Sequence, residues 1–471
     1  MSVAAKKRLL GRYTRHGYLC FAEAREAFAT GRDSPSAFLE RCLEQIDQLE
    51  PQVQAFVSLD VEGARQAAAA STERWRRGAD ISVVDGLPVG IKDCYDIRGL
   101  PTRVNSDLFP DHRAAIDAAH VDALRRGGAV ILGKTVTTEL TMGWPGPTRN
   151  PWDLDRTPGG SSSGSAAAVA ARMIPLATGS QVRGSTIRPA SICGIVGFKP
   201  TYGALNRNGG FDPSPSLNHL GLLGGRLTDV WETARFVARE AGGDPGCLAL
   251  AGSDTLPEPR KPLRLARQYT AGWQHTDDNS KRTFEAFLRA LAMQGVEIVE
   301  PAMTPALLAY EEATTDVPAF FFDLMLWEMR WPMRALREAH PEAVSETVAG
   351  YIAAAERLTV DDHRRAYARR EALRAQHRAL QGEVDGFVTL AHIGPGQLGR
   401  PLVGTPWYND ASSAIGAPAF GLPMLRVFPS GLPLGVQLVG FEGEDEELAA
   451  IAHWLLRWSR PAGPYANTGM V

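Results

Sequence analysis

Residues 157–203 read TPGGSSSGSAAAVAARMIPLATGSQVRGSTIRPASICGIVGFKPTYG, a stretch unusually rich in glycine, serine and alanine. The small residues Gly159 to Ser165 run directly into a helix-forming series of alanines. Such a loop at a helix N-terminus can turn several N–H groups and hydroxyls toward one point. A second turn of small residues follows and contains Ser185. Side chains this small indicate segments whose backbones pack closely together.

Lys92 lies upstream of these loops, directly after the strand-like apolar run Val89 to Ile91. A second apolar run, Ala129 to Leu132, follows a helical stretch that ends at Gly127 and Gly128. Strands and helices in alternation favour a layered α/β fold. A lysine at the end of a buried strand is partly desolvated, which lowers its pKa and lets it act as a base near neutral pH.

The rest of the chain follows the same alternation. Residues 34–50 have helical spacing after a capping serine, and we expect Pro51 to stop this helix. A proline-rich, charged segment at 255–262 indicates a link to a second α/β region. Residues 305–380 are expected to form long helices, and residues 435–440 a strand.

The composition argues against several classes of protein. The 471 residues, 44% hydrophobic and 22% charged, are typical of a globular protein with one large domain or a few ordinary ones. A net charge of -3 argues against nucleic acid as the main partner, because phosphate binding needs a concentrated positive surface. No apolar run suits a membrane span or a secretory signal. The five cysteines include no C-x-x-C pair, which favours a reduced, cytoplasmic setting.

Four segments carry a resemblance to a known family. Residues 159–170, 179–185 and 193–203 match a serine- and glycine-rich signature, and residues 88–93 match a lysine segment of the form P-x-G-x-K-D. Weaker agreement extends from about Ser34 to Arg457. In this ordered set of matches the sequence resembles the amidase signature family.

The resemblance implies a catalytic triad without histidine. It places the nucleophile at Ser185, the bridging cis-serine at Ser161 and the general base at Lys92. Neutral Lys92 would take a proton from Ser161, whose oxygen takes one from Ser185, so that Ser185 attacks the amide carbonyl and forms an acyl-enzyme. No metal and no organic cofactor are implied.

The resemblance also implies an oxyanion hole and supporting residues. The oxyanion hole would be formed by the backbone N–H groups of Val182, Arg183, Gly184 and Ser185. Removing one donor of this kind costs about 3–4 kcal/mol of transition-state stabilisation. Ser162 is expected to support Ser161 by a hydrogen bond, next to Gly160.

The chain departs from the family pattern beside the nucleophile. Gln181 stands where an aspartate is usual and Arg183 where a glycine is usual. The run from Thr186 to Arg188 shifts an arginine by one place, and Thr389 to His392 replaces a more proline-rich segment. These departures bear on the residues around the nucleophile, and hence on the choice of substrate.

Other nucleophiles fit the sequence less well. Residues 160–164 also satisfy G-x-S-x-G, the nucleophile elbow of α/β-hydrolases, with Ser162 as nucleophile. That elbow follows a hydrophobic strand, whereas residues 153–158 are mostly polar. Cys94 has no turn beside it to hold an oxyanion, and Glu139 is expected to stabilise structure near the lysine.

An aromatic run at Phe320, Phe321 and Phe322, with Trp327 and Trp331, leaves two interpretations open. Core packing on a helix is the first, and a wall of the substrate pocket is the second. A pocket wall would favour an apolar or aromatic amide.

The resemblance implies a single large α/β/α domain over residues 1–471, with a twisted mixed sheet covered by helices. The signature would occupy residues 30–250, and a variable helical and C-terminal half residues 263–460. The expected function is hydrolysis of a small apolar or aromatic carboxamide. The partner would be a small-molecule amide, without nucleic acid or membrane, and a homodimer is left open.

Several alternatives to this function stay open. The first is a glutamine-hydrolysing subunit of a tRNA-dependent amidotransferase, and the second a urea-type, biuret-like amide hydrolase. A catalytically inactive assembly subunit is the third. Arg183 or Arg188 could also present a guanidinium to a substrate carboxylate, which would favour an acidic amide.

Overall fold

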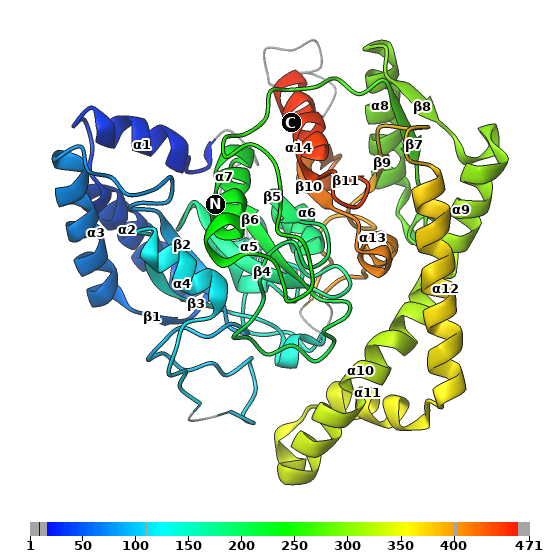
Figure 1. Cartoon of the computed structure of the whole chain (residues 1–471), viewed down its shortest axis with the longest axis horizontal. Helices are drawn as coiled ribbons and strands as arrows, with labels where there is room; N and C mark the ends of the chain where they lie inside the picture. Colours follow the sequence, from blue (N-terminus) through cyan, green and yellow to red (C-terminus); the bar gives the residue numbers. More distant parts are fainter. Residues whose placement is uncertain (1–8, 10–16, 110–111, 400–402, 460–471) are drawn as a thin grey trace.

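The computed structural model describes residues 9, 17–109, 112–399 and 403–459. Eleven strands of these residues form one sheet (Figure 1). In spatial order they are β1 (Phe56–Leu59), β3 (Val130–Thr135), β2 (Pro88–Lys92), β4 (Leu176–Gln181), β6 (His219–Gly224), β5 (Val196–Lys199), β10 (Ala419–Val427), β11 (Leu432–Val439), β9 (Phe387–Leu390), β7 (Arg264–Arg267) and β8 (Glu297–Val299).

The sheet is mixed. Strand β2 runs parallel to β3 and β4, and β7 runs parallel to β8 and β9. The strands between these groups pair antiparallel, from β4 through β6, β5, β10 and β11 to β9. Every residue of β2 and β4 is buried, and apart from the final Lys92 and Gln181 their side chains are apolar or small.

Fourteen helices of the described residues cover this sheet, as expected for a single α/β domain. They are α1 (Phe21–Ala29), α2 (Pro35–Val53), α3 (Val61–Arg76), α4 (Ala119–Arg126), α5 (Ser163–Ala170), α6 (Ile187–Cys193), α7 (Leu227–Ala241), α8 (Asp278–Met293), α9 (Pro305–Thr315), α10 (Val317–Ala339), α11 (Glu346–Arg357), α12 (Val360–Ala379), α13 (Asp410–Ile415) and α14 (Asp445–Trp458). The long helices expected at 305–380 are present, and α10 to α12 project from the rest of the molecule (Figure 1).

One predicted boundary is wrong, because Pro51 does not stop helix α2. The helix continues to Val53, whose side chain is fully buried in the core. It closes at Gln54, which has a left-handed backbone and donates its N–H to the carbonyl of Glu50 over 2.9 Å. A proline close to the C-terminal end of a helix removes only the hydrogen bond of its own missing N–H. Burial of the Val53 side chain favours the continued helix.

Helix α5 explains the small residues of the serine-rich loop. All eight of its residues are buried, and it packs against β2, β3 and β4. A Cβ atom on Gly164 would lie 2.2 Å from the carbonyl oxygen of Ala55 and 2.4 Å from the N atom of Val136. Any larger residue there would therefore push the helix away from the sheet.

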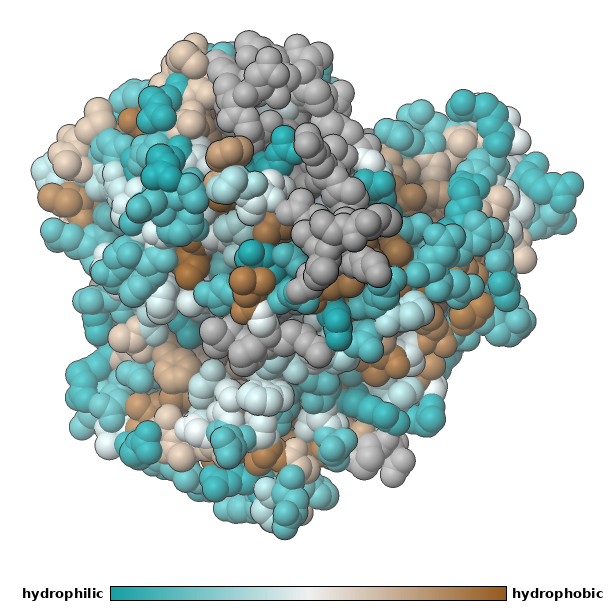
Figure 2. Space-filling model, turned by 180° about the vertical axis from the view of Figure 1, so that it is seen from behind, coloured by the Kyte–Doolittle hydropathy of each residue, from teal (hydrophilic) through white to brown (hydrophobic). Residues whose placement is uncertain are grey.

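The surface of one face is mainly hydrophilic, with hydrophobic residues in small separate groups (Figure 2). Within the described residues, no helix is both long enough and apolar enough to cross a membrane.

Candidate active site

Lys92 is the last residue of β2 and is completely buried. Its Nζ lies 2.7 Å from the hydroxyl oxygen of Ser161 and 2.7 Å from that of Ser180. Burial lowers the pKa of Lys92 to about 8, because the charged ammonium loses its hydration. At about pH 7, roughly a tenth of this amine is therefore neutral, far more than for an ordinary lysine.

The backbone around Ser161 accepts hydrogen bonds from two other segments of the chain. The peptide bond between Gly160 and Ser161 is cis. The carbonyl of Gly160 accepts a hydrogen bond of 2.8 Å from the Nε of Arg188, and the carbonyl of Ser161 accepts one from the N–H of Thr138. With 2% of its surface exposed, Ser161 lies between the buried amine and a cavity that it helps to line.

Ser185 lies in the turn between β4 and α6 and lines the same cavity as Ser161. Its carbonyl accepts a hydrogen bond from the N–H of Ser162, which joins the two serine loops. Among the described residues, no hydrogen bond joins the hydroxyls of Ser161 and Ser185. The structure thus brings Lys92 and Ser161 into contact and places Ser185 beside them.

The turn before Ser185 presents several free donors. Within the part of the chain that the structure describes, the N–H groups of residues 182–185 donate to no protein acceptor. Val182, Arg183 and Ser185 line the cavity. Unpaired backbone N–H groups are uncommon at buried positions, and they are the donors that an oxyanion needs.

Ser162 contacts a different residue from the one expected. Its hydroxyl lies 3.3 Å from the N–H of Ser180 and 3.5 Å from the carbonyl of Ser180, rather than bonding to the Ser161 hydroxyl. The side chain of Ser162 points toward β4 because Ser162 is the first residue before α5, which packs against that strand. Ser162 therefore supports the site through β4 and through its N–H bond to Ser185.

Gln181 retains the function of a hydrogen-bond acceptor at the end of β4. Its side-chain oxygen accepts from the N–H groups of Thr186 and Ile187, each over 2.9 Å. Its amide nitrogen donates to the hydroxyl of Ser413 over 3.0 Å. These bonds satisfy N–H groups at the start of α6 and hold the turn around Ser185.

The two arginines near the nucleophile are both engaged by protein groups. Arg183 donates from its Nε to Asp410 over 2.8 Å and makes a second bond to the other carboxylate oxygen. Although burial opposes the charged form, Asp410 raises the pKa of Arg183 above its ordinary value. Arg188 donates to the carbonyls of Gly160 and Gly404.

The cavity that contains Ser185 has a volume of about 270 Å³. Large apolar side chains form much of its wall: Met142, Trp144, Phe322, Met325, Met329 and Tyr351. Among the described residues, no aspartate or glutamate lines it. The cavity therefore suits a ligand with an apolar group and no positive charge.

The aromatic run divides between the two interpretations. Phe320 and Phe321 are buried in the core, whereas Phe322 lines the cavity. Trp327 stacks on His363 with ring centroids 4.8 Å apart, and 70% of Trp331 is exposed. One residue of the run therefore contributes to the pocket wall.

The surroundings of Cys94 and Glu139 favour structural roles for both residues. Cys94 is 1% exposed, and burial raises the pKa of its thiol. The carboxylate of Glu139 accepts from the N–H of Ser345, the residue before α11. In the described residues no group of three histidine, cysteine, aspartate or glutamate side chains could hold a metal ion.

Ser180 is a site residue that sequence reasoning missed. Thr178 and Ser180 are two residues apart on β4, so their side chains lie on one face of the strand. The Thr178 hydroxyl accepts from the N–H of Lys92, and the Ser180 hydroxyl contacts its Nζ. Alternation along β4 could have indicated the pair, but only the pairing of β4 with β2 places it against Lys92.

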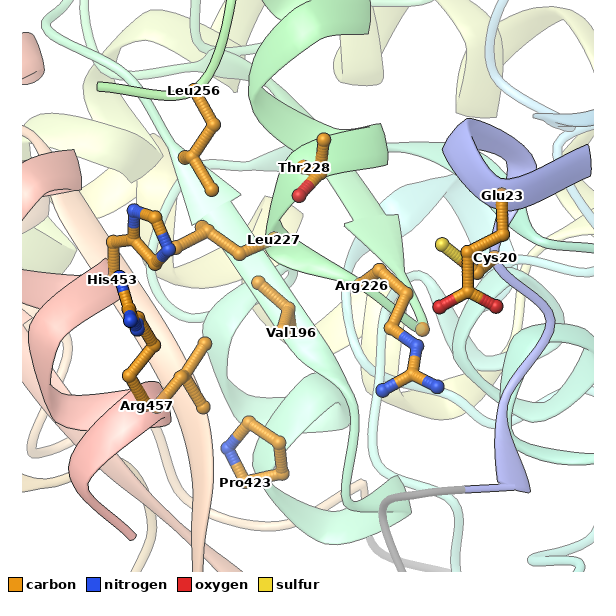
Figure 3. Close-up of a pocket in the computed structure, with 12 residues that line it drawn as sticks. Cys20, Glu23, Val196, Arg226, Leu227, Thr228, Leu256, Pro423, His453 and Arg457 are labelled. Atoms are coloured by element: carbon orange, nitrogen blue, oxygen red, sulfur yellow. The ribbon is translucent and has the colours of Figure 1, made fainter. Parts of the chain in front are cut away.

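A second cavity, of about 160 Å³, lies near the start of α7 and the end of α14 (Figure 3). Arg226, His453 and Arg457 are among the residues around it. Its nucleophilic side chain is Cys20, and burial raises the pKa of this thiol to about 12. A protonated thiol is a weak nucleophile, so this cavity is a less suitable candidate active site than the one beside Ser185.

The fold and the family match place this chain among enzymes that act on amide C–N bonds. Residues 37–449 match the sequence profile of the Amidase family. The match covers most of the chain, and the chain therefore belongs to the amidase family.

The chain is similar over most of its length to proteins of known name and to solved structures. The chain is 33% identical to a subunit of the glutamyl-tRNA(Gln) amidotransferase of Roseiflexus castenholzii, over 92% of this chain and 94% of that protein. A crystal structure of an amidase is similar with a TM-score of 0.81 and 30% identity, covering 93% of this chain and 99% of that one. A protein from a vestigial complex, connected with the evolutionary origins of an s-triazine catabolic enzyme, has a TM-score of 0.80 and 27% identity, with 93% and 98% covered.

Proposed function

We propose that the protein hydrolyses a carboxamide through an acyl-enzyme on Ser185, with Lys92 as the base and Ser161 as the proton relay. The observation that carries this proposal is the contact of 2.7 Å between the Nζ of Lys92 and the hydroxyl oxygen of Ser161. The lowered pKa of Lys92, about 8, supports a neutral amine that can accept a proton. A lysine of this kind is an effective base near neutral pH.

The reaction then proceeds in two stages. Lys92 takes the proton of Ser161, and Ser161 takes that of Ser185, whose oxygen forms a bond to the amide carbon. The tetrahedral oxyanion is stabilised by N–H groups of residues 182–185, the proton returns through Ser161 to the leaving nitrogen, and the amine or ammonia departs. Water then attacks the ester with the same base, which releases the acid and restores Ser185.

The walls of the cavity favour a neutral amide with an apolar or aromatic group. Trp144, Phe322 and Tyr351 offer aromatic surface, and each aromatic contact contributes about 0.5–1.5 kcal/mol beyond burial of its area. Arg183 and Arg188 are bound to protein oxygens, which weakens the case for a substrate carboxylate at either one.

Glutamine hydrolysis within an amidotransferase complex is the second candidate, and the names of the curated relatives favour it. Those relatives are amidotransferase subunits, and their name includes tRNA. The expected exclusion of nucleic acid therefore loses support.

A homodimer, a urea-type substrate and a cytoplasmic location stay predictions. The intact set of Lys92, Ser161 and Ser185 weighs against an inactive assembly protein.

A substrate panel separates the two candidates. We expect kcat/KM for a benzamide-type amide to exceed that for glutamine by about tenfold or more, since two or three aromatic contacts together favour the aromatic group. Ser185→Ala, which lacks the proposed nucleophile, is the inactive control for both substrates. A clear preference for glutamine would support the amidotransferase function instead, and it would leave the triad intact.

A further inference from the structure

Helix α13 contacts the turn before Ser185 at several points. Its first residue, Asp410, binds the guanidinium of Arg183, and the hydroxyl of Ser413 donates to the carbonyl of Arg183 over 2.6 Å. The same hydroxyl accepts from the amide of Gln181 over 3.0 Å. A Cβ on Gly184 would lie 2.4 Å from the Oδ1 of Asn409, so the turn and the start of α13 are in close contact.

We propose that Asp410 and Ser413 are positioning residues of the amide hydrolysis, which hold Arg183 so that the N–H groups of the turn face the oxyanion. This inference rests on the function proposed above and adds two residues to it. It also gives a structural setting to two of the departures from the family pattern, because Gln181 and Arg183 both bind α13.

The planarity of the peptide bond explains how Ser413 acts at a distance. In a trans peptide the C=O and the following N–H point in opposite directions. A hydrogen bond that directs the carbonyl of Arg183 toward α13 therefore directs the N–H of Gly184 away from α13. Loss of the Ser413 hydroxyl would release this carbonyl and let the peptide plane rotate.

Asp410 holds Arg183 as well, by binding the guanidinium of its side chain. The side chain of Asp410 is fully buried, and the side chain of Arg183, which lines the cavity, is 21% exposed. The guanidinium carbon of Arg183 also lies over the ring of Phe322, 5.7 Å from the ring centroid. A planar guanidinium bound through two nitrogens has little freedom to turn, so the backbone of Arg183 is anchored as well.

The chain contains a matched control for this ion pair. Asp85 is also fully buried, and it also binds an arginine, Arg74, which is 28% exposed. Both pairs have two bonds, and the Nε bonds measure 2.9 Å for Arg74 and 2.8 Å for Arg183. Neither Asp85 nor Arg74 lines the cavity. Asp85→Asn therefore reproduces the loss of a buried ion pair without touching the turn.

The first test compares Asp410→Asn with Asp85→Asn. We measure the rate at which a sulfonyl fluoride labels Ser185, kcat and KM for one amide, and the melting temperature. Asp410→Asn is expected to lower the labelling rate and kcat by about 10- to 100-fold, with KM within about threefold of wild type. Asp85→Asn should lower the melting temperature with little change in kcat. Equal labelling rates in the two variants would overturn the inference.

Ser413 provides the second test if Asp410→Asn does not fold. Ser413→Ala is expected to lower kcat and the labelling rate by about tenfold or more, whereas Ser413→Thr, which keeps the hydroxyl, should recover most of the loss. Equal kcat in Ser413→Ala and wild type would overturn the role of Ser413. If wild-type protein is not labelled at Ser185, the proposed function fails first, and the inference fails with it.

Discussion

Two lysines are buried on neighbouring strands, and their partners differ. The Nζ of Lys134 on β3 lies 2.9 Å from the carboxylate of Asp93. The Nζ of Lys92 on β2 contacts the hydroxyls of Ser161 and Ser180. A carboxylate stabilises the charged form of a buried lysine, whereas two hydroxyls only partly replace its hydration. Of these two lysines, the one on β2 is therefore better suited to act as a base.

The pH dependence of the reaction tests this assignment. Burial lowers the pKa of Lys92 to about 8, and only the neutral amine accepts a proton. We therefore expect kcat/KM to rise about tenfold per pH unit below that pKa and to level off above it. Lys92→Ala should lower kcat by several orders of magnitude and remove the inflection. A wild-type profile that stays flat between about pH 6 and about pH 9 would contradict the role of Lys92.

For single residues, the sequence indicates candidate positions but not their contacts, and the catalytic roles stay predictions. Lys92, Ser161 and Ser185 stand out because each lies at a strand end or in a loop of small residues. The expected partner of Ser162 is wrong, since the direction of its side chain depends on how α5 packs against β4. Ser180 escapes prediction because its contact with Lys92 depends on strand order, which the residue pattern does not contain.

Helix α10 shows how a single element serves both the core and the pocket. Successive residues of a helix are rotated by about 100°, so three consecutive aromatic side chains cannot all face the same way. Phe320 and Phe321 enter the core, and Phe322 reaches the cavity, where its ring lies 5.5 Å from that of Tyr351. The sequence predicts the helix and its aromatic content, but not which residue lines the cavity.

Phe322→Ala tests the pocket wall. The variant should lower kcat/KM for an aromatic amide by about 2- to 10-fold, because one aromatic contact is lost, and should change that for acetamide much less. Trp331→Ala is the control on the same helix, since that side chain is 70% exposed and lies outside the cavity. Equal losses for both substrates in Phe322→Ala would indicate general damage to the site rather than a contact with the aromatic group.

Across the whole molecule, one sheet joins the parts of the chain before and after residues 255–262. Strands β1 to β6 come from the first part and β7 to β11 from the second, and they meet where β5 pairs with β10. The turn of Ser185 also meets α13 from the second part. The alternation of strands and helices predicts the α/β class, whereas the order of eleven strands depends on long-range pairing that no local pattern contains. The division into halves at 30–250 and 263–460 stays a prediction.

Separate expression of the two parts tests this dependence. Residues 1–258 alone leave β5 without β10 and the Ser185 turn without α13. We expect this fragment to aggregate, because an unpaired central strand is a template for association, and to show no labelling of Ser185. Co-expression with residues 259–471 should restore part of the labelling. A soluble first fragment that is labelled at the wild-type rate would show that the site forms without the second part.

Ser185 is the nucleophile and Lys92 the base in the reaction proposed above. The most direct measurement is peptide mapping by mass spectrometry after treatment of the whole protein with a sulfonyl fluoride. We expect one adduct, on Ser185, that is absent from Ser185→Ala and forms much more slowly in Lys92→Ala. An adduct on Ser162 instead, at an unchanged rate in Lys92→Ala, would contradict the account.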